Sequence, residues 1–249
     1  PRKYEMSSKF EKPTYELPVS EIISLSFSLY LSRPLDFVLP FVVAGLISAL
    51  PAAVFTPFSL GFPYTASPAT IISYLVQAIF GSVVIGIVSA IIHAAASGIA
   101  VRHASEVLEG RTPTLTDSLS FTLSRLISLL VAGIIVGILV GIGAIFLIIP
   151  GIILAIMFYL VNPAIIIEKA GAIDALGRSR NLVGGRWLKT FGIMLVLFVL
   201  SFLFGSVVSV FALASLFAGP LGSLASALIT NIIVALINPI GAISNTYLY

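Results

Sequence analysis

Hydrophobic and charged residues are separated along this chain into long blocks. Residues 37–101, 126–167 and 190–249 contain no Lys, Arg, Asp or Glu, and these tracts are 65, 42 and 60 residues long. A charge at the centre of a bilayer costs about 2.5–3.5 kcal/mol on insertion scales, so charge-free apolar tracts mark the chain that lies in lipid. One span needs about 20 apolar residues, so each tract can hold two spans and a turn. The pattern predicts an all-α integral membrane protein with six transmembrane helices arranged as three hairpins.

The charged segments before the hairpins are expected to form short amphipathic helices on the inner membrane surface. They cover residues 18–33, the residues from Thr116 onwards, and a stretch whose apolar face is Ile173, Leu176 and Val183. Asp117 is expected to cap the second of these helices. Residues 1–17 form a polar N-terminal arm, and residues 18–249 form a single six-helix membrane domain. The expected spans are residues 35–55, 69–101, 126–148, 151–168, 190–217 and 220–247, with a very tight turn at 149–151.

The placement of the basic residues predicts the orientation of the chain. All 13 Lys and Arg residues lie outside the three tracts, and the hairpins bring them to one side of the membrane. The positive-inside rule makes that side cytoplasmic, so we expect a multi-pass protein of the cell membrane with both termini in the cytoplasm. A hydrophobic content of 59% and a mean hydropathy of +1.15 exclude an ordinary soluble domain. The basic residues are expected to face anionic lipids of the inner leaflet, at about 1 kcal/mol each, and not nucleic acid.

Small residues recur at four-residue spacing in three of the predicted spans. The glycines of these stripes are Gly86 and Gly98 in the second span, Gly133, Gly137 and Gly141 in the third, and Gly205 in the fifth. Such stripes let helix backbones approach closely, and in lipid close van der Waals contact replaces the hydrophobic effect as the force that joins helices. We expect them to pack helices together within this chain. Packing against another membrane subunit or a second copy is the alternative.

Few polar side chains lie inside the predicted spans. The candidates that would line a polar path are His93, Asn162, Asn231 and Asn238. Intramembrane polar residues are costly and can mark a substrate path, but each can also bond to a neighbouring helix for about 0.6 kcal/mol. We favour helix-to-helix bonds for the asparagines. Asn162-Pro163 and Asn238-Pro239 each place a proline late in a span, where it is expected to kink the helix.

A basic and aromatic segment, which we call the elbow, precedes the fifth span. It comprises Arg178, Arg180, Arg186, Trp187 and Lys189. Its cations suit an anionic lipid headgroup or the acidic loop of a partner. Topology-anchoring charge beside an interfacial Trp explains the same residues without any ligand. If the protein binds a lipid headgroup, the elbow is the first place where we expect it.

Catalytic chemistry finds little support in this sequence. There is no Ser, His and acid set, no His, Asp and Glu cluster with metal-ligand spacing, and no phosphate-binding glycine loop beside a lysine. Cysteine is absent, which excludes disulfides and thiol chemistry. His103, Glu106, Glu109 and Asp117 share one charged segment, but their spacing does not demand a site, and we interpret them as solvated loop charges. We predict a protein that is not an enzyme and uses no metal or cofactor.

Short motifs give this chain a resemblance to a known family. They are Pro150, Gly151, Pro163, Glu168, Ala175, Ser179, Leu182, Gly185, Arg186 and Trp187, together with Gly110, Arg111, Pro113 and the opening helix from Glu21 to Arg33. With these residues the chain resembles an uncharacterised family of polytopic membrane proteins. That family is related to the membrane domain of some glycerophosphoryl diester phosphodiesterases and includes the YciC-like proteins. The resemblance implies a six-span bundle and no activity, because the phosphodiesterase chemistry belongs to a separate soluble domain.

The function we expect is that of a non-enzymatic membrane protein that acts as an accessory or scaffolding subunit or organises lipid. The alternative is a transporter or channel for a small uncharged or weakly polar solute. Convergence of the polar candidates on a water-accessible cavity would favour transport. Scattered polar residues, each at its own helix contact, would favour the scaffold.

Overall fold

The computed structural model describes residues 16–55, 67–215 and 219–249, without the side chains of 50–55, 211–215 and 219–228. Within these ranges the chain forms helices and no strand. The helices are α2 (Val19–Ser32), α3 (Pro34–Phe55), α4 (Pro68–Leu108), α5 (Leu115–Phe146), α6 (Ile148–Met157), α7 (Val161–Ile167), α8 (Ala172–Gly184), α9 (Trp187–Ser215) and α10 (Gly219–Leu248). The predicted all-α class is confirmed for these ranges, and most of the predicted polar arm lies outside the described residues.

Several of these helices are suited to cross a membrane. Five stretches are long and apolar enough: Pro68–Leu108, Leu115–Phe146, Ile148–Ile167, Trp187–Val210 and Ile229–Leu248. The pair α2 and α3 is a sixth candidate, although it bends by 87°. The bend falls at Arg33-Pro34, because a residue before proline avoids the helical region. The described part of the chain is therefore that of a multi-pass helical membrane protein with five or six spans by length and composition.

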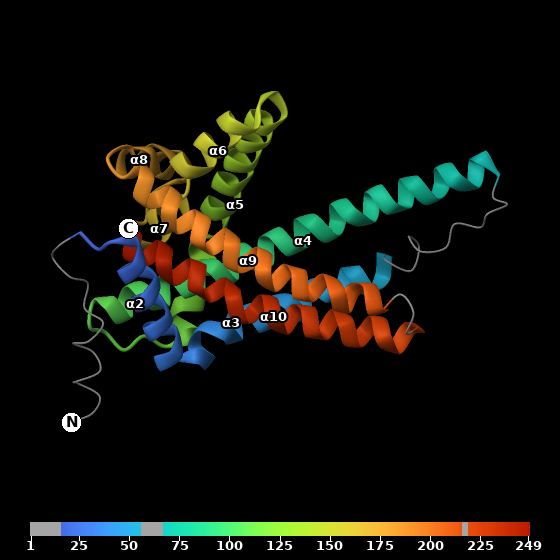
Figure 1. Cartoon of the computed structure of the whole chain (residues 1–249), viewed down its shortest axis with the longest axis horizontal. Helices are drawn as coiled ribbons and strands as arrows, with labels where there is room; N and C mark the ends of the chain where they lie inside the picture. The colour runs from blue at the N-terminus through green and yellow to red at the C-terminus, as the bar shows by residue number, and fades with distance from the viewer. Residues whose placement is uncertain (1–15, 56–66, 216–218) are drawn as a thin grey trace.

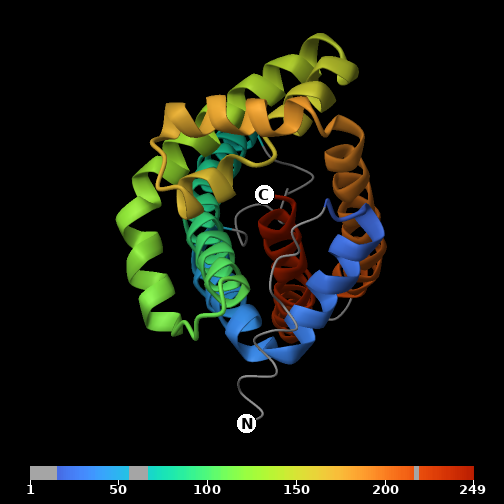
Figure 2. The same ribbon diagram turned by 90° about the vertical axis from the view of Figure 1, so that its left-hand side faces the viewer.

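The helices spread out from one end of the molecule, which we call the charged end (Figure 1). α2, α7 and α8 lie there, together with the start of α3 and the end of α4. The charged residues of the described ranges lie in or next to these segments, in the first three turns of α5 and in the first turn of α9. α4 and the α9–α10 hairpin extend away from the charged end, whereas α5 and α6 rise steeply across that direction (Figures 1 and 2). The second predicted hairpin therefore does not run parallel to the third.

A single helix, α5, replaces two elements that were expected to be separate, namely the surface helix from Thr116 and the span at residues 126–148. No Gly or Pro lies between Thr116 and Leu126, so nothing interrupts the helix there. At its start, the Thr114 hydroxyl accepts a hydrogen bond from the Asp117 backbone N–H at 3.1 Å and donates to the Asp117 carboxylate at 2.6 Å. Thr114, and not Asp117 as predicted, is therefore the N-cap.

The turn between α5 and α6 is as tight as predicted, but it falls at Leu147 and not at 149–151. Leu147 has extended backbone, with φ −160° and ψ 140°. Pro150 lies in the first turn of α6, where a missing N–H is harmless because that turn has no helical acceptor for it. Gly151 brings the two helices close together, since a Cβ at this position would lie 2.9 Å from Ala144.

The packed core of the described residues lies at the charged end. On α4 the buried positions are concentrated between Ala96 and Leu108. The most apolar window of α4 is only 6% buried, and so is that of α9. α10 lies in the middle of the bundle and contacts α2, α3, α4 and α9 (Figure 2). The outer parts of α4 and α9 therefore present apolar side chains to lipid or to another protein on nearly every side.

Candidate functional site at the charged end

The fourth predicted span is broken in its middle. α6 ends at Met157, and α7 begins at Val161. Pro163 accounts for the break, because it has no N–H for the carbonyl four residues earlier and its ring clashes with that carbonyl. The helix is thus interrupted just before Asn162-Pro163, where a kink was expected, although Ile148–Ile167 still counts as one candidate span. α10, by contrast, continues as one helix through Pro239.

A side chain of α8 bonds the backbone groups that the break leaves free. The Ser179 hydroxyl accepts the Leu160 N–H at 3.1 Å and donates to the Met157 carbonyl at 2.8 Å. Ser179 is fully buried. One hydroxyl thus satisfies a donor and an acceptor that would otherwise be left unpaired in an apolar environment, and it fastens α8 to the broken span.

The face of α8 that packs against the bundle overlaps only in part with the predicted one. Ala175, Ser179 and Val183 recur every four residues and have no exposed surface. Of the predicted face, Val183 is buried and Leu176 is partly buried against the core, but Ile173 is 75% exposed. The serine was missed because apolar periodicity alone assigns a polar residue to the solvent side, whereas here its hydroxyl replaces a helical hydrogen bond.

An ion pair joins α8 to the end of α7. Arg178 donates to both carboxylate oxygens of Glu168 over distances of 2.7–3.0 Å. The hydrogen bonds from Arg178 lower the pKa of Glu168, and the same bonds raise the pKa of Arg178. Burial raises the pKa of Tyr249, which lies beside this pair, to about 12. The end of α10 therefore meets the α7–α8 segment at an ionised Glu–Arg pair and a neutral phenol.

The elbow divides into paired and unpaired cations. Its residues lie in the second half of α8, in the turn after it and at the start of α9: Arg178, Arg180, Arg186, Trp187 and Lys189. Arg178 is held by Glu168, and Arg186 is held by Glu16 at 2.7 Å. The two other cations have no ion pair within the described ranges. Half of the positive charge that we assigned to a lipid headgroup or an acidic partner is therefore already neutralised inside the protein.

A second group of cations, which we call the Phe121 cluster, was not predicted. It consists of Arg102 from α4, Phe121 and Arg125 from α5, and Lys169 after α7. The Arg102 Cζ lies 4.2 Å from the centroid of the Phe121 ring, and the Lys169 Nζ lies 5.8 Å from it. Arg125 donates to the Lys169 carbonyl at 3.1 Å. Because these residues come from three distant segments, the sequence carried no signal for their meeting.

A buried histidine faces a carboxylate where α3 and α4 meet. The His103 side chain is 1% exposed, and its Nε2 lies 3.5 Å from Asp36 Oδ2. Its ring stands edge-on to Phe37, with centroids 5.3 Å apart. The interpretation of His103 and Glu106 as solvated loop charges is wrong, because α4 continues through both residues and buries them. Glu106 pairs with Arg102 on the same helix. No group of three His, Asp or Glu within the described ranges is placed to hold a metal ion.

The candidates for a polar path lie in separate helix contacts. Asn162 of α7 donates to Ser97 of α4 at 2.7 Å. Asn231 of α10 lies against Gly45 of α3. A Cβ built on Gly45 would be 3.0 Å from the Oδ1 of Asn231. Asn238 lies between α9 and α10. The fourth candidate, His93, is half-buried on α4. The three asparagines thus serve three different pairs of helices.

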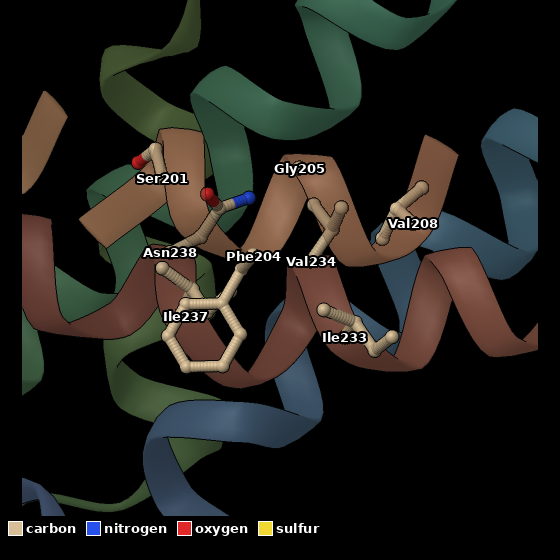
Figure 3. A pocket seen from close by; sticks show the side chains of 8 residues that line it. All are labelled: Ser201, Phe204, Gly205, Val208, Ile233, Val234, Ile237 and Asn238. Atoms are coloured by element: carbon tan, nitrogen blue, oxygen red, sulfur yellow. The ribbon is translucent and has the colours of Figure 1, made fainter. Parts of the chain in front are cut away.

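The groove at Asn238 is small and largely apolar (Figure 3). It is lined by Ser201, Phe204, Gly205, Val208, Ile233, Val234, Ile237 and Asn238 and has a volume of about 100 Å³. Ser201 and Asn238 lie together at one end of it. Small-molecule sites usually occupy about 300–1,000 Å³, so this groove is too small for a typical solute.

Most of the predicted packing glycines have no described atom close to the place that a Cβ would take. Gly98 does pack closely, since a Cβ there would lie 2.5 Å from the Thr122 methyl carbon. At Gly86, Gly133, Gly137, Gly141 and Gly205 a Cβ would meet nothing within 4 Å. At these five positions the described residues supply no close contact to a Cβ, because α5 and the outer parts of α4 and α9 diverge from the bundle, so the expected packing within this chain stays a prediction there. The alternative, contact with another subunit or a second copy, stays open.

These features define a multi-pass helical membrane protein with its charged residues at one end. The chain belongs to the family described as Domain of unknown function (DUF7847), whose model matches residues 22–244. No curated protein and no solved structure matches the chain. These comparisons show no link to glycerophosphoryl diester phosphodiesterases.

Proposed function

We propose that this protein is a non-enzymatic accessory or scaffolding subunit of the cell membrane that packs its glycine-bearing helices against a partner's transmembrane helices. The observation that carries the proposal is the stripe of Gly133, Gly137 and Gly141 on α5. These glycines recur every four residues, and none has an atom of the described chain near the place of its missing Cβ. In lipid, such flat stripes are where helices approach each other most closely.

The exposure of the spans supports the same proposal. A bundle that was complete by itself would bury one side of each span. Instead, the most apolar windows of α4, α5 and α9 are 6%, 17% and 6% buried. The helices that carry the free glycines are thus also those whose apolar windows are the least buried, since the windows of Ile148–Ile167 and Ile229–Leu248 are 39% buried.

The charged end is assigned to the cytoplasm, and both termini with it. The support is the positive-inside rule, because the basic residues of the described chain lie in segments that meet at one end. The scattered asparagines favour a scaffold over the transporter, since each asparagine lies at its own helix contact.

The test is purification of the tagged protein from native membranes in a mild detergent, followed by measurement of the mass and composition of the complex. We expect a stoichiometric complex with another membrane protein or a second copy. A triple variant with Gly133→Leu, Gly137→Leu and Gly141→Leu should lose that complex yet keep its monomer stability, because a Cβ at each position has no described atom within 4 Å.

The matched control shifts the substitutions by one position along α5. Ile134, Ile138 and Ile142 are 62%, 56% and 49% exposed, so changing them to Leu alters another exposed strip of the helix without adding bulk. This control should keep the complex. Isolation of the unmodified protein as a lone monomer, or equal loss of the complex in both triple variants, would overturn the proposal.

A further inference from the structure

The α5–α6 hairpin runs in a different direction from the other long helices. α3, α4, α9 and α10 pack against one another and extend away from the charged end, whereas α5 and α6 run across that direction (Figure 1). In Figure 2, which is viewed from the charged end, the α5–α6 hairpin lies across the view. A flat bilayer has one normal, and the direction shared by the other four helices suits it. The α5–α6 hairpin therefore lies at a steep angle to the membrane normal that these helices define.

The length of α5 leaves no room for such a tilt in a full crossing. Phe146, at the end of α5, is 21 residues beyond Arg125, the last charged residue of the helix. At 1.5 Å per residue this stretch is about 31 Å long, close to the thickness of the hydrocarbon core, which is about 30 Å. α5 would therefore reach the far side only if it stood along the normal. α9 has a longer uncharged stretch, from Thr190 to Ser215, and reaches the far side even at a moderate tilt.

One side of α5 is apolar and exposed along almost the whole helix. Its large exposed side chains recur at spacings of four or seven residues, which keeps them on one side: Leu119, Leu123, Ile127, Ile134, Ile138 and Ile145. The stripe begins before Arg125, since Leu119 and Leu123 are 41% and 51% exposed. In a hairpin that stood along the normal, these two leucines would lie with the charged residues outside the hydrocarbon core. A hairpin that lies closer to the membrane plane keeps the whole stripe in contact with acyl chains.

The turn of the hairpin lies only about half a bilayer from a charged helix. The Ser179 hydroxyl donates to the Met157 carbonyl at 2.8 Å, which fixes α8 beside the end of α6. Arg180 of α8 is exposed, and a charge is costly in hydrocarbon, so α8 lies at the membrane surface. Leu147 is ten residues from Met157, or about 15 Å of helix, which is half the thickness of the hydrocarbon core. The residues of the turn are all apolar and exposed: Ile145, Phe146, Leu147, Ile148 and Ile149.

We propose that the α5–α6 hairpin enters only the leaflet next to the charged end, with its turn at Leu147 near the middle of the bilayer, and packs the exposed side of α5 against the acyl chains of that leaflet. The hairpin does not reach the far side, although its uncharged tract of 42 residues is long enough for two crossings. The inference goes beyond the proposed function, because it concerns the depth of the hairpin in lipid and requires no partner subunit.

The experiment compares two single-cysteine variants of the full chain in lipid vesicles. The chain has no cysteine of its own, so each label reports one position. Phe146→Cys and Val210→Cys are matched, because both side chains are exposed, at 78% and 64%, and each lies 21 residues beyond the last charged residue of its helix, Arg125 or Lys189. Length alone places both at the same depth. Electron paramagnetic resonance of nitroxide labels, with oxygen and a water-soluble nickel chelate as relaxing agents, measures that depth. We expect the Phe146 label to lie nearer the charged end than the Val210 label by about 10 Å or more along the normal.

Reaction with a membrane-impermeant maleimide gives a second readout on sealed vesicles. Ser67→Cys, at the N-cap of α4, marks the far side of the membrane and should react there. Phe146→Cys should react from neither side until detergent dissolves the vesicles. Its reaction from the far side would show a full crossing, and its reaction from the charged side would show a turn outside the lipid, so either result overturns the proposal. Equal depths of the Phe146 and Val210 labels would overturn it as well.

Discussion

Replacement of Ser179 by alanine is the sharpest test of how the charged end is held together. The substitution removes one oxygen atom from a fully buried position and adds nothing that can clash. It leaves the Leu160 N–H and the Met157 carbonyl without the partner that they have at 3.1 and 2.8 Å. A buried polar group left unpaired costs about 1–3 kcal/mol, so two such groups predict a loss of about 2–6 kcal/mol in the free energy of unfolding.

The assay is reversible unfolding of the purified protein in mixed micelles, with hydrogen exchange followed at the break. We expect the Leu160 amide to exchange faster in Ser179→Ala, because its acceptor is gone. Ser124→Ala is the control. Its hydroxyl bonds only to the Phe121 carbonyl within the same helix at an exposed position, so its removal should cost less than about 0.5 kcal/mol. If Ser179→Ala and Ser124→Ala were equally stable and the Leu160 amide exchanged at its original rate, the assigned role of Ser179 would be refuted.

Three further outcomes are expected. Gly98→Ala should lower the free energy of unfolding by about 1–3 kcal/mol, because its methyl group would overlap the methyl group of Thr122. Gly86→Ala places its methyl group in open space and should cost nothing. Unfolding measurements on the two variants compare them directly. Arg178 holds the pKa of Glu168 below its ordinary value of 4.5, so their pair adds stability above that pH and loses it as the pH falls through the lowered pKa. Glu168→Gln should therefore cost less than about 1 kcal/mol at neutral pH and nothing in acid, as unfolding at several pH values would show. A reporter that is active only in the cytoplasm should be active when it is fused after Tyr249. Activity of a reporter that works only outside the cytoplasm would contradict the assigned orientation.

Charge placement and proline positions made much of the fold predictable. The charge-free tracts predict where long apolar helices lie, because a charge in lipid is too costly to be placed at random. Pro163 predicts the break in the fourth span, since its ring chemistry acts on residues close in sequence. The tight turn at Leu147 follows from the length of its tract, although the position was missed by two residues. Each of these rests on local chemistry or on length.

The features that depend on distant segments could not be predicted. Ser179 looks like any polar residue of a surface helix until the break at Met157 lies beside it. Nothing in the sequence around Lys169 indicates its positive φ. Asp36 and His103, which meet in the structure, are far apart along the chain. A glycine stripe has the same sequence pattern whether its partner helix belongs to this chain or to another protein. Only the spatial arrangement separates Gly98 from Gly137, which share a spacing but not a neighbour.

The central position of α10 has a consequence for how the molecule is made. α10 is the last of the described helices to be synthesised, yet its Ser244 donates to Ser26 of α2 across 218 residues of sequence, at 3.0 Å. Ribosomes add about 5–20 residues per second, so α2 waits roughly 10–40 s for this contact. During that time α2, α3, α4 and α9 surround a place that nothing yet fills. Insertion of the final hairpin is therefore the step that closes the fold, and chains stalled before α10 should be those that the cell degrades.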